Sequence, residues 1–397
     1  MATDDALGDA AVALTAELVG IDSVNPGLVP GAAGESGAVE HLRDRLQRSG
    51  FETHVVVPEG AADRPSLVAL SQAAIPGPTV LFTGHLDTVG VEGMDEPFAA
   101  TVDGDRLSGR GSSDMKAGVA AMVVAAEELL RRRVPGRVVL ALVADEEDAS
   151  AGAEAVLGAL PHLGIRADVA VVGEPTWLAV ARSLRGYALV EVVFAGRAAH
   201  SSQPDEGVNA VVHLGRLLAA VEARDAALAG HGASLMVTVA SGGDSPFVLA
   251  RSARALVERR TVAGESSRAA LDEVEELLDA LRADDPGVDA TARLVVGREA
   301  WRLDQHGPAA TLADALETSL ADTAPDSPVP PRLDAPYWME APLWQEAGIP
   351  ALVCGPAGGG LHAADEWVDL GQVRQYAVAL TAAVERWAAE AAVGHAH

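Results

Sequence analysis

The sequence contains a single cysteine, Cys354, among 397 residues, and therefore cannot form a disulfide within the chain. Proteins without disulfides are typical of reducing compartments, so we expect a cytoplasmic location. The first residues, MATDDALGDAAVAL, are acidic where a secretory signal would be basic, and no apolar run has the length of a membrane span. Cys354 ends the apolar run IPALVCG with no activating base near it in sequence, which favours core packing over a reactive thiol.

Positive charge is also scarce in this chain. Lysine and arginine number 29 against 57 aspartates and glutamates, which gives a formal net charge of −28 at pH 7. A chain so acidic is not expected to bind nucleic acid or an anionic membrane surface. Lys116 is the only lysine, and it follows Asp114 by two residues in a Gly/Ser turn. We hypothesise that an ammonium fits this turn and a guanidinium does not.

Length and periodicity predict two domains built from helices and strands. A chain of 397 residues, 49% of them hydrophobic, is too long for one ordinary core. Before residue 185, helical and strand-like patterns alternate, as they do in α/β proteins with a buried sheet. We expect helices at 5–19 and 34–49 and strands at 51–57, 66–71, 79–84, 137–144 and 168–172.

The segment 185–299 follows a different order. Strands are expected at 187–196, 234–243, 251–262 and 288–297, with helices at 207–225 and 265–284. This β-α-β-β-α-β order is typical of a ferredoxin-like sandwich. Past residue 300 the α/β pattern returns, with a strand at 350–354 and a helix at 370–391. We therefore predict a larger α/β domain made of residues 1–184 and 300–397, interrupted by a smaller domain at 185–299.

The segment GHLDTVG, residues 84–90, places an imidazole and a carboxylate at the end of an expected buried strand. His85 and Asp87 are two residues apart, so both side chains point the same way if the chain stays extended. A hydrogen bond that closes the strand end explains this pair as well as a functional site does. The rest of the chain has to decide between the two explanations.

Other polar residues follow strands elsewhere in the larger domain, at the carboxyl ends where α/β sheets carry their chemistry. They are Asp114 in GRGSSDMKAG, Glu146 and Glu147 in DEEDASAGA, Glu174 in GEPT and His362 in HAADEWV. Singly, each is explained as a helix cap, an acidic edge or a loop histidine. Together, several carboxylates gathered at one edge repel one another unless a cation lies among them. Mixed imidazole and carboxylate ligands suit Zn, Mn or Co better than Ca or Mg.

In this order, the motifs GHLDTVG, GRGSSDMKAG, DEEDASAGA, GEPT and HAADEWV resemble those of the M20 family of dinuclear zinc metallopeptidases and deacylases. The resemblance runs from LVGIDSVNPG (18–27) to residue 368. It implies a zinc-peptidase-like α/β catalytic domain with an inserted ferredoxin-like lid that dimerises, and hence a homodimer. It also implies two divalent metal ions, zinc first, with Co or Mn as alternatives.

The same resemblance assigns roles to the polar residues. Asp114 bridges the two ions, Glu147 and His362 complete one set of ligands, and His85 and Glu174 complete the other. Asp87 would orient His85, because a carboxylate beside a ligating imidazole fixes its orientation and raises its basicity. Glu146 would act as general base on the metal-bridging water, whose pKa the cations lower, and would then protonate the leaving amine. The alternative is that Glu146 is only the outer half of an acidic pair.

Two segments of the inserted domain also resemble family motifs, namely GRAAHSSQPDEGVNA (196–210) and LVERRTVAGE (256–265). By this resemblance His200 stabilises the carbonyl oxyanion from the partner subunit, and Asn209 lies near the substrate. Arg260 binds the substrate carboxylate, a task that suits the planar fork of a guanidinium. Because Arg259 precedes it on an expected strand, the two arginines face opposite ways and only one of them can reach the site.

The ligand motifs do not separate one acyl group from another. The resemblance favours amide hydrolysis of a small N-acyl amino acid, as in acetylornithine deacetylase, with a di- or carboxypeptidase acting on short peptides as the alternative. A catalytically silent binder of metal or amino acids is disfavoured by the intact Glu146 and Asp87, and a serine hydrolase by the lack of a G-x-S-x-G elbow. Trp177 and the run 337–339 either line an apolar pocket or pack in the core, and we expect the core.

Overall fold

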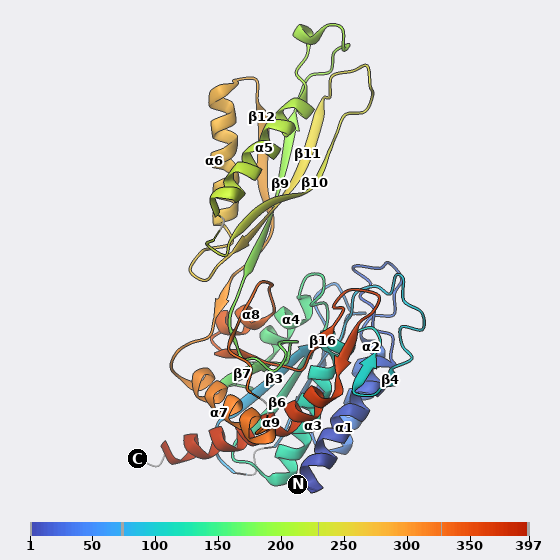
Figure 1. Ribbon diagram of the computed structural model, residues 1–397, viewed down its shortest axis with the longest axis vertical. Coiled ribbons are helices and arrows are strands. Elements are labelled where there is room, and N and C mark those ends of the chain that lie inside the picture. Colours follow the sequence, from blue (N-terminus) through green and yellow to red (C-terminus); the bar gives the residue numbers. More distant parts are fainter. Residues whose placement is uncertain (1, 73–74, 229, 327, 395–397) are drawn as a thin grey trace. The chain divides into compact units, whose positions relative to one another are not determined.

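A computed structural model describes residues 2–72, 75–228, 230–326 and 328–394 of the chain (Figure 1). By its internal contacts the chain divides into two compact units. Unit 1 comprises Met1–Arg182, Leu303–Leu333 and Leu343–His397, and unit 2 comprises Ser183–Arg302 and Asp334–Pro342. Among the described residues, no helix combines the length and the apolar character needed to cross a membrane.

Unit 1 is built on a six-stranded sheet with the order β1-β2-β6-β3-β7-β15. These strands are β1 (Glu52–Val56), β2 (Ser66–Leu70), β3 (Thr79–His85), β6 (Arg137–Val143), β7 (Val169–Val172) and β15 (Ala351–Val353). β6, β3, β7 and β15 run parallel, whereas β2 is antiparallel to both of its neighbours. The parallel strands are continuous buried apolar runs, as expected when a sheet is covered on both faces. Their carboxyl ends therefore meet at one edge of the sheet.

Helices cover this sheet. They are α1 (Ala2–Val19), α2 (Ser36–Arg48), α3 (Ala117–Arg132), α4 (Ala151–Ala159), α7 (Pro308–Thr323) and α9 (Leu370–Gly394). α1, α3 and α9 pack against one another, and α7 packs against α9. α3 is buried continuously from Ala117 to Ala126, because its alanines and valines are small enough for close packing on every side. α3 thus places the start of its first turn firmly against the sheet.

A small antiparallel sheet in unit 1 was not predicted. It has the order β16-β17-β5-β4 and consists of β16 (Gly358–Gly359), β17 (Trp367–Asp369), β5 (Arg106–Ser108) and β4 (Thr101–Asp103). β17 pairs with β5, so the loop that precedes β17 lies beside the π-helical turn η1 (Ser112–Lys116) that follows β5. This pairing joins two segments more than 240 residues apart and brings the candidate ligands Asp114 and His362 into one neighbourhood.

Unit 2 has the β-α-β-β-α-β order expected of a ferredoxin-like sandwich (Figure 1). Its elements are β9 (Gly186–Ala195), η2 (Pro204–Glu206), α5 (Ala210–Leu228), β10 (Ser234–Gly242), β11 (Ser252–Thr261), α6 (Ala269–Asp284) and β12 (Asp289–Arg298). The strands form an antiparallel sheet with the order β10-β11-β9-β12. Both helices cover the same face, where alternate strand residues such as Val190, Val192 and Val257 are fully buried.

The borders of unit 2 differ from those of the expected inserted domain at 185–299. Residues 334–342, which the sequence places in the larger domain, belong to unit 2. The backbone N–H of Arg185 donates to the carbonyl oxygen of Tyr337 at 3.2 Å, and the rings of Tyr187 and Trp338 meet edge to face. Local periodicity cannot reveal that a later segment returns to an earlier domain. The remaining elements are β8 (Ala181–Leu184), β13 (Trp301–Arg302), β14 (Leu333–Ala335) and α8 (Ala341–Glu346).

Candidate metal centre

Parallel strands of unit 1 deliver the candidate ligands to one edge of the sheet. β3 ends in His85, Glu147 lies in the turn after β6, and Glu174 follows β7 by two residues. Asp114 lies in η1, directly before α3, and His362 lies in the loop before β17. All five residues that the sequence singles out as ligands are therefore on segments that converge at this edge.

Gly118, in the first turn of α3, allows this convergence. A Cβ atom at this position would lie 1.9 Å from the carbonyl oxygen of Gly173, the residue before Glu174. No side chain fits there, so only glycine lets the start of α3 touch the end of β7. The η1 turn and its Asp114 are held against the sheet edge as a result.

Asp114 lies between two histidines, one on each side of its carboxylate. Its Oδ1 is 3.1 Å from Nε2 of His85, and its Oδ2 is 3.3 Å from Nε2 of His362. Glu174 Oε1 is 3.8 Å from the same nitrogen of His85, and Glu147 Oε2 is 3.1 Å from that of His362. Two sets result, His85–Asp114–Glu174 and Asp114–Glu147–His362, and in each the ligand atoms lie within 4.8 Å of one another. Asp114 is common to both sets.

The charges of these groups show what the arrangement favours. Burial would raise the pKa of Asp114, but hydrogen bonds from His362 and His85 hold it well below its usual range. Burial and the Asp114 charge raise the pKa of Glu147. Hydrogen bonds to Asp114 and Glu147 raise the pKa of His362 to about 10. Positive charge next to these carboxylates therefore stabilises their ionised forms. Divalent cations supply such charge, and the mixed nitrogen and oxygen donors fit Zn, Mn or Co.

Asp87 contacts His85, but in a different way from the one the sequence predicts. Nδ1 of His85 donates to the backbone carbonyl oxygen of Asp87 at 2.9 Å, while the Asp87 carboxylate is 3.6 Å away. This bond occupies Nδ1, so Nε2 is the nitrogen that faces Asp114 and that would bind a metal. The carboxylate instead accepts the backbone N–H groups of Glu146 and Glu147, at 3.1 and 3.2 Å. The imidazole is therefore oriented by the backbone of Asp87.

Glu146 is half-buried next to Glu147. Among the described residues it belongs to neither of the two ligand sets. Its charge nevertheless acts on the site: burial would lower the pKa of His85, but the hydrogen bond to Asp114 and the charges of Glu174 and Glu146 raise it well above its usual value. Glu146 is thus close to the ligands without being one of them, as a general base has to be.

Glu366 is a site residue that the sequence analysis missed. It follows His362 by four residues, and its Oε1 accepts the backbone N–H groups of Ser113 and Asp114 at 2.9 and 3.1 Å. Its Oε2 accepts the N–H of Gly111 at 2.9 Å and pairs with Arg110 at 2.7 Å. One buried carboxylate therefore fixes the turn that presents Asp114. The signal in the sequence was a second acidic residue within HAADEWV.

Lys116 is fully buried behind the same turn, with only 1% of its surface exposed. Its Nζ donates to the carbonyl oxygen of Ile21 at 2.7 Å. Its stem lies so close to Gly111 that a Cβ there would be 3.0 Å from the Lys116 Cδ. Burial lowers the pKa of Lys116 to about 8. The ammonium thus ties the loop after α1 to η1 in a tightly filled space.

Two expectations of core packing have opposite outcomes. Cys354 is fully buried, as predicted, and burial raises the pKa of its thiol to about 12.

Trp177 is not part of the core, because 42% of its surface is exposed. Its indole N–H donates to the carbonyl oxygen of Gly358 at 3.1 Å, and Gly358 N–H donates to Ser113 Oγ at 3.2 Å. Trp177 is thus an exposed aromatic side chain fixed next to the turn of Asp114. In the run 337–339, Met339 is buried and the two aromatic residues are half-buried.

In unit 2, the two neighbouring arginines of β11 face opposite sides of the sheet. Arg259 lies on the helix-covered face, where it pairs with Glu273 at 2.7 Å and Glu265 at 3.3 Å. Arg260 lies on the other face, beside the ring of Tyr187, and pairs with Glu258 at 2.5 Å. Arg259 is committed to packing within unit 2, so Arg260 is the one of the two that is open to a ligand.

The other two candidates of unit 2 lie near its surface. Nδ1 of His200 is 2.8 Å from Ser202 Oγ, and this histidine is exposed. Asn209 Oδ1 accepts the backbone N–H of Val211 at 3.1 Å, so it caps the start of α5. The cap engages the side-chain oxygen of Asn209 and not its amide N–H groups.

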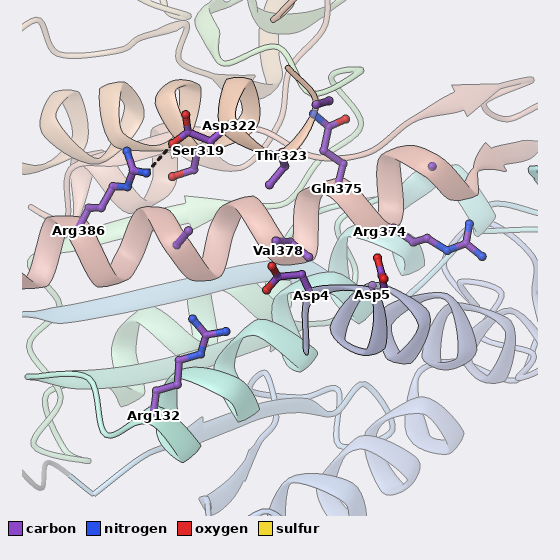
Figure 2. Close-up of a pocket in the computed structure, with 14 residues that line it drawn as sticks. Asp4, Asp5, Arg132, Ser319, Asp322, Thr323, Arg374, Gln375, Val378 and Arg386 are labelled. Atoms are coloured by element: carbon purple, nitrogen blue, oxygen red, sulfur yellow. Dashed lines mark hydrogen bonds and ion pairs between the residues drawn. The ribbon is translucent and has the colours of Figure 1, made fainter. Parts of the chain in front are cut away.

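A cavity of about 670 Å³ lies elsewhere in unit 1, among α1, α3, α7 and α9 (Figure 2). Two of its lining side chains, Arg386 and Asp322, form an ion pair at 2.5 Å. Neither ligand set found among the described residues contributes to its lining. The candidate centre is thus distinct from this cavity.

The family model described as peptidase family M20/M25/M40 matches residues 81–386 of the chain. The chain belongs to this family. Its mixed α/β fold and its place among the metallopeptidases and deacylases, which are hydrolases, are therefore as predicted. The family match covers every residue of both ligand sets.

Two curated relatives illustrate the similarity. Acetylornithine deacetylase of Myxococcus xanthus is 30% identical over 270 residues, 65% of this chain and 70% of that protein. Succinyl-diaminopimelate desuccinylase of Roseobacter denitrificans is 34% identical over 224 residues, 52% of this chain and 55% of that protein. The chain thus spans about half the length of the desuccinylase that it matches.

Solved structures of M20 peptidases share the fold. A tripeptidase from Staphylococcus aureus superposes with a TM-score of 0.77 at 18% identity, over 96% of this chain and 99% of that one. A dinuclear metal-binding peptidase of the M20 family from Bacillus subtilis superposes with a TM-score of 0.72 at 17% identity, over 96% and 99%. At such identities the likeness is one of fold.

Proposed function

We propose that this chain is a dinuclear metal-dependent hydrolase that cleaves the amide bond of a small N-acyl amino acid, like an acetylornithine deacetylase. One observation carries the proposal: the Asp114 carboxylate has an imidazole nitrogen on each side, at 3.1 and 3.3 Å. A carboxylate placed in this way suits two cations at once. The curated deacetylase and desuccinylase relatives support amide hydrolysis of small acylated amino acids.

Each cation has its own residues in this proposal. His85 and Glu174 would hold one, Glu147 and His362 would hold the other, and Asp114, which belongs to both sets, would be shared by the two. The donor set favours Zn, with Co or Mn as alternatives. Two bound cations would lower the pKa of a bound water so that it is readily deprotonated near neutral pH, and would polarise the scissile carbonyl group.

The chain itself moves the protons and holds the substrate. Glu146 accepts the proton of the attacking water and then passes a proton to the leaving nitrogen, so that the amide C–N bond breaks and a free amine departs. His200 donates a hydrogen bond to the oxyanion that develops on the carbonyl oxygen. Arg260 binds the substrate carboxylate through its fork, and Asn209 contributes an amide N–H to the substrate.

The second candidate function is a di- or carboxypeptidase of the same family, since a tripeptidase shares the fold. Both functions use the same residues and differ in what lies on the acyl side of the bond. A catalytically silent relative that binds metal or amino acids is a third candidate, which the presence of Glu146 in its turn disfavours. The single buried cysteine leads us to propose a cytoplasmic location for any of them.

We also propose a homodimer, with His200 acting on the partner's substrate. Exposed apolar side chains on α5 and β10 support an interface there, among them Val211, Val212 and Met236. Two inactive variants, His200→Ala and Glu146→Ala, test it when mixed under conditions that exchange subunits. Half of the dimers are then mixed and have one intact site, so about a quarter of wild-type activity returns. A mixture as inactive as its parts contradicts the shared site.

The decisive experiment for the function is a turnover panel with added Zn, Mn or Co. Its substrates are N-acetylornithine, N-succinyl-diaminopimelate, several N-acyl amino acids and several dipeptides, and the readout is free amine. The deacylase proposal expects turnover of N-acyl amino acids above that of dipeptides. The reverse order supports the peptidase, and the absence of turnover with every substrate and metal supports the silent binder.

A further inference from the structure

A buried network of polar side chains is bonded to the turn that carries Glu146 and Glu147. Its members are Asn25, Glu35, Arg64, Asp87 and Asp145, and each exposes at most 8% of its surface. Buried polar groups in such numbers persist where their hydrogen bonds are satisfied and where the geometry that they hold matters. Asn25 lies in LVGIDSVNPG, the segment with which the family resemblance begins, but the sequence analysis assigns no role to it or to Arg64.

Asp87 holds the turn from one side. Its Oδ1 accepts the backbone N–H of Glu146 at 3.1 Å, and its Oδ2 accepts that of Glu147 at 3.2 Å. Oδ2 also accepts Nδ2 of Asn25, at 2.7 Å. The Asp87 carboxylate therefore depends on Asn25 for its orientation, and the two glutamates depend on Asp87.

Asp145 holds the same turn at its start. It has a φ of +70°, a left-handed conformation that residues other than glycine rarely adopt. Its carboxylate pairs with Arg64 at 2.9 Å, and Arg64 in turn pairs with Glu35 at 2.6 Å. Asp145 also accepts Nδ2 of Asn25 at 3.2 Å. The unusual backbone conformation is thus held by side chains on two sides.

Asn25 joins these two carboxylates. An amide nitrogen carries two hydrogens, and those of Asn25 go to Asp87 and to Asp145. Its Oδ1 accepts the backbone N–H of Gly27 at 2.8 Å, and its own N–H donates to the carbonyl oxygen of Thr88 at 2.8 Å. The side chain is therefore held by three hydrogen bonds and the backbone of Asn25 by a fourth, which fixes the orientation of the amide. As a neutral group with two donors, the amide bridges the two carboxylates without adding charge to the network.

We propose that Asn25 is a positioning residue for the reaction. Its amide holds Asp87 and Asp145 together and thereby fixes the turn that presents Glu146 as base and Glu147 as ligand. Asn25 itself touches neither ligand set. The proposal rests on the roles that the proposed function gives to Glu146 and Glu147, but the geometry of the turn stands apart from any substrate.

Asn25→Asp is the sharpest variant, because it keeps the size of the side chain while it replaces two donors by a carboxylate between carboxylates. We expect kcat to fall by about 10- to 100-fold, the usual effect of losing a partner of a metal ligand, while KM changes little. Affinity for the cation held by Glu147 and His362 falls more than that for the other, so cobalt titration followed by visible absorption shows one weakened site. Gln47→Glu makes the same chemical change on the exposed face of α2, where Gln47 contacts Thr53, and serves as the control.

A reciprocal exchange separates positioning from general instability. In the double variant Asn25→Asp/Asp87→Asn, the donor and the acceptor of the bond between positions 25 and 87 trade places and the net charge is restored, whereas the bonds to Asp145 and to the Glu147 N–H are not. We expect its loss of kcat to be smaller than the product of the losses of the two single variants, with cobalt affinity partly regained. Losses that simply multiply overturn the proposal, as does an Asn25→Asp protein with wild-type kcat and two equal cobalt sites.

Two safeguards keep the test decisive. If Asn25→Asp does not fold, Asn25→Ala removes the amide without adding charge, and it is expected to weaken the same cobalt site. Wild-type cobalt affinity in a folded Asn25→Ala protein overturns the proposal. If the wild-type protein hydrolyses none of the panel substrates, the proposed function fails, whereas the cobalt titrations still decide the role of Asn25.

Discussion

Arg110 and Glu366 form an almost fully buried ion pair, with Nη1 of the arginine 2.7 Å from Oε2 of the glutamate. The same guanidinium donates to the carbonyl oxygens of Gly90 and Ala363, at 3.0 and 3.1 Å. Glu366 accepts the backbone N–H of Asp114 at 3.1 Å. Three loops that carry candidate metal ligands or their neighbours are therefore joined through one pair of side chains.

Glu366→Gln is expected to lower the free energy of unfolding by about 3–5 kcal/mol, because it leaves the Arg110 charge buried without its partner. It should also weaken metal binding, since the turn of Asp114 loses its strongest acceptor. Urea unfolding with and without added zinc measures both effects. Arg374→Gln breaks an exposed pair with Asp9 and should change stability by less than about 1 kcal/mol. Equal effects of the two variants contradict the prediction.

Glu146→Ala should keep the wild-type metal content and lose turnover by about two to four orders of magnitude, the usual contribution of general acid–base catalysis. Asp114→Ala should lose both metals, because this carboxylate belongs to both ligand sets. Metal analysis after dialysis, together with steady-state kinetics, distinguishes the two variants. If Glu146→Ala loses metal, the roles within the pair Glu146 and Glu147 are reversed.

Trp177→Ala is expected to raise KM for substrates with a bulky apolar acyl group by about 10-fold or more, because burying an indole face removes a large apolar area from water. The KM for N-acetyl substrates should change less, since an acetyl group covers little of the ring. Val55→Ala removes another exposed apolar side chain of unit 1, on β1, and is the control. Equal changes of KM for both substrate types would falsify a role for Trp177 in selecting the acyl group.

Lys116→Arg should reduce metal content and turnover, because the larger guanidinium does not fit the closely packed space between Gly111 and Ile21. Lys116→Met loses the hydrogen bond to Ile21. It should nevertheless retain more metal than Lys116→Arg, because it keeps the shape of the stem. Metal content and melting temperature of the two purified variants test this order. A Lys116→Arg protein with full metal content and turnover contradicts the prediction, because the turn then accepts a guanidinium as well as an ammonium.

Cys354 predicts a pH dependence of stability. Burial raises the pKa of its thiol from 9.0 to about 12. Between these values the unfolded chain releases a proton that the folded chain retains, so stability falls as pH rises from 9 towards 12. At pH 10.5 the loss is about 2 kcal/mol relative to pH 8. The difference in unfolding free energy between wild type and Cys354→Ala, measured at both pH values, isolates it, and a difference independent of pH contradicts it.

The sequence predicts the parts of the fold that have strong local patterns. The parallel strands β3, β6 and β7 were expected within about one residue of their bounds, because each is a continuous apolar run between polar turns. β4, β5, β16 and β17 were missed, since strands of two or three residues have no periodicity. They form only because distant segments meet.

In the candidate site, too, residues in local motifs were predicted, whereas residues that act through distant contacts were not. The five candidate ligands were singled out because carboxylates gathered with histidines at strand ends repel one another unless a cation lies among them, which the sequence pattern itself indicates. Asn25 and Glu366 were given no role, because their hydrogen bonds go to groups far away in the sequence, the Asp87 carboxylate for Asn25 and the backbone N–H of Asp114 for Glu366. Trp177 was misjudged because apolar character predicts burial only on average, whereas one bond to Gly358 holds this indole at the surface.

The burial of the only lysine has a consequence for the chemistry of the folded surface. Reagents directed at amines, such as succinimidyl esters or acetylating enzymes, find no lysine side chain to modify on the folded protein, because Lys116 exposes 1% of its surface. Its amine becomes reachable only when the loop after α1 opens away from η1. The rate at which Lys116 is labelled therefore measures how often this loop opens, so the chain carries its own reporter of motion behind the candidate metal centre.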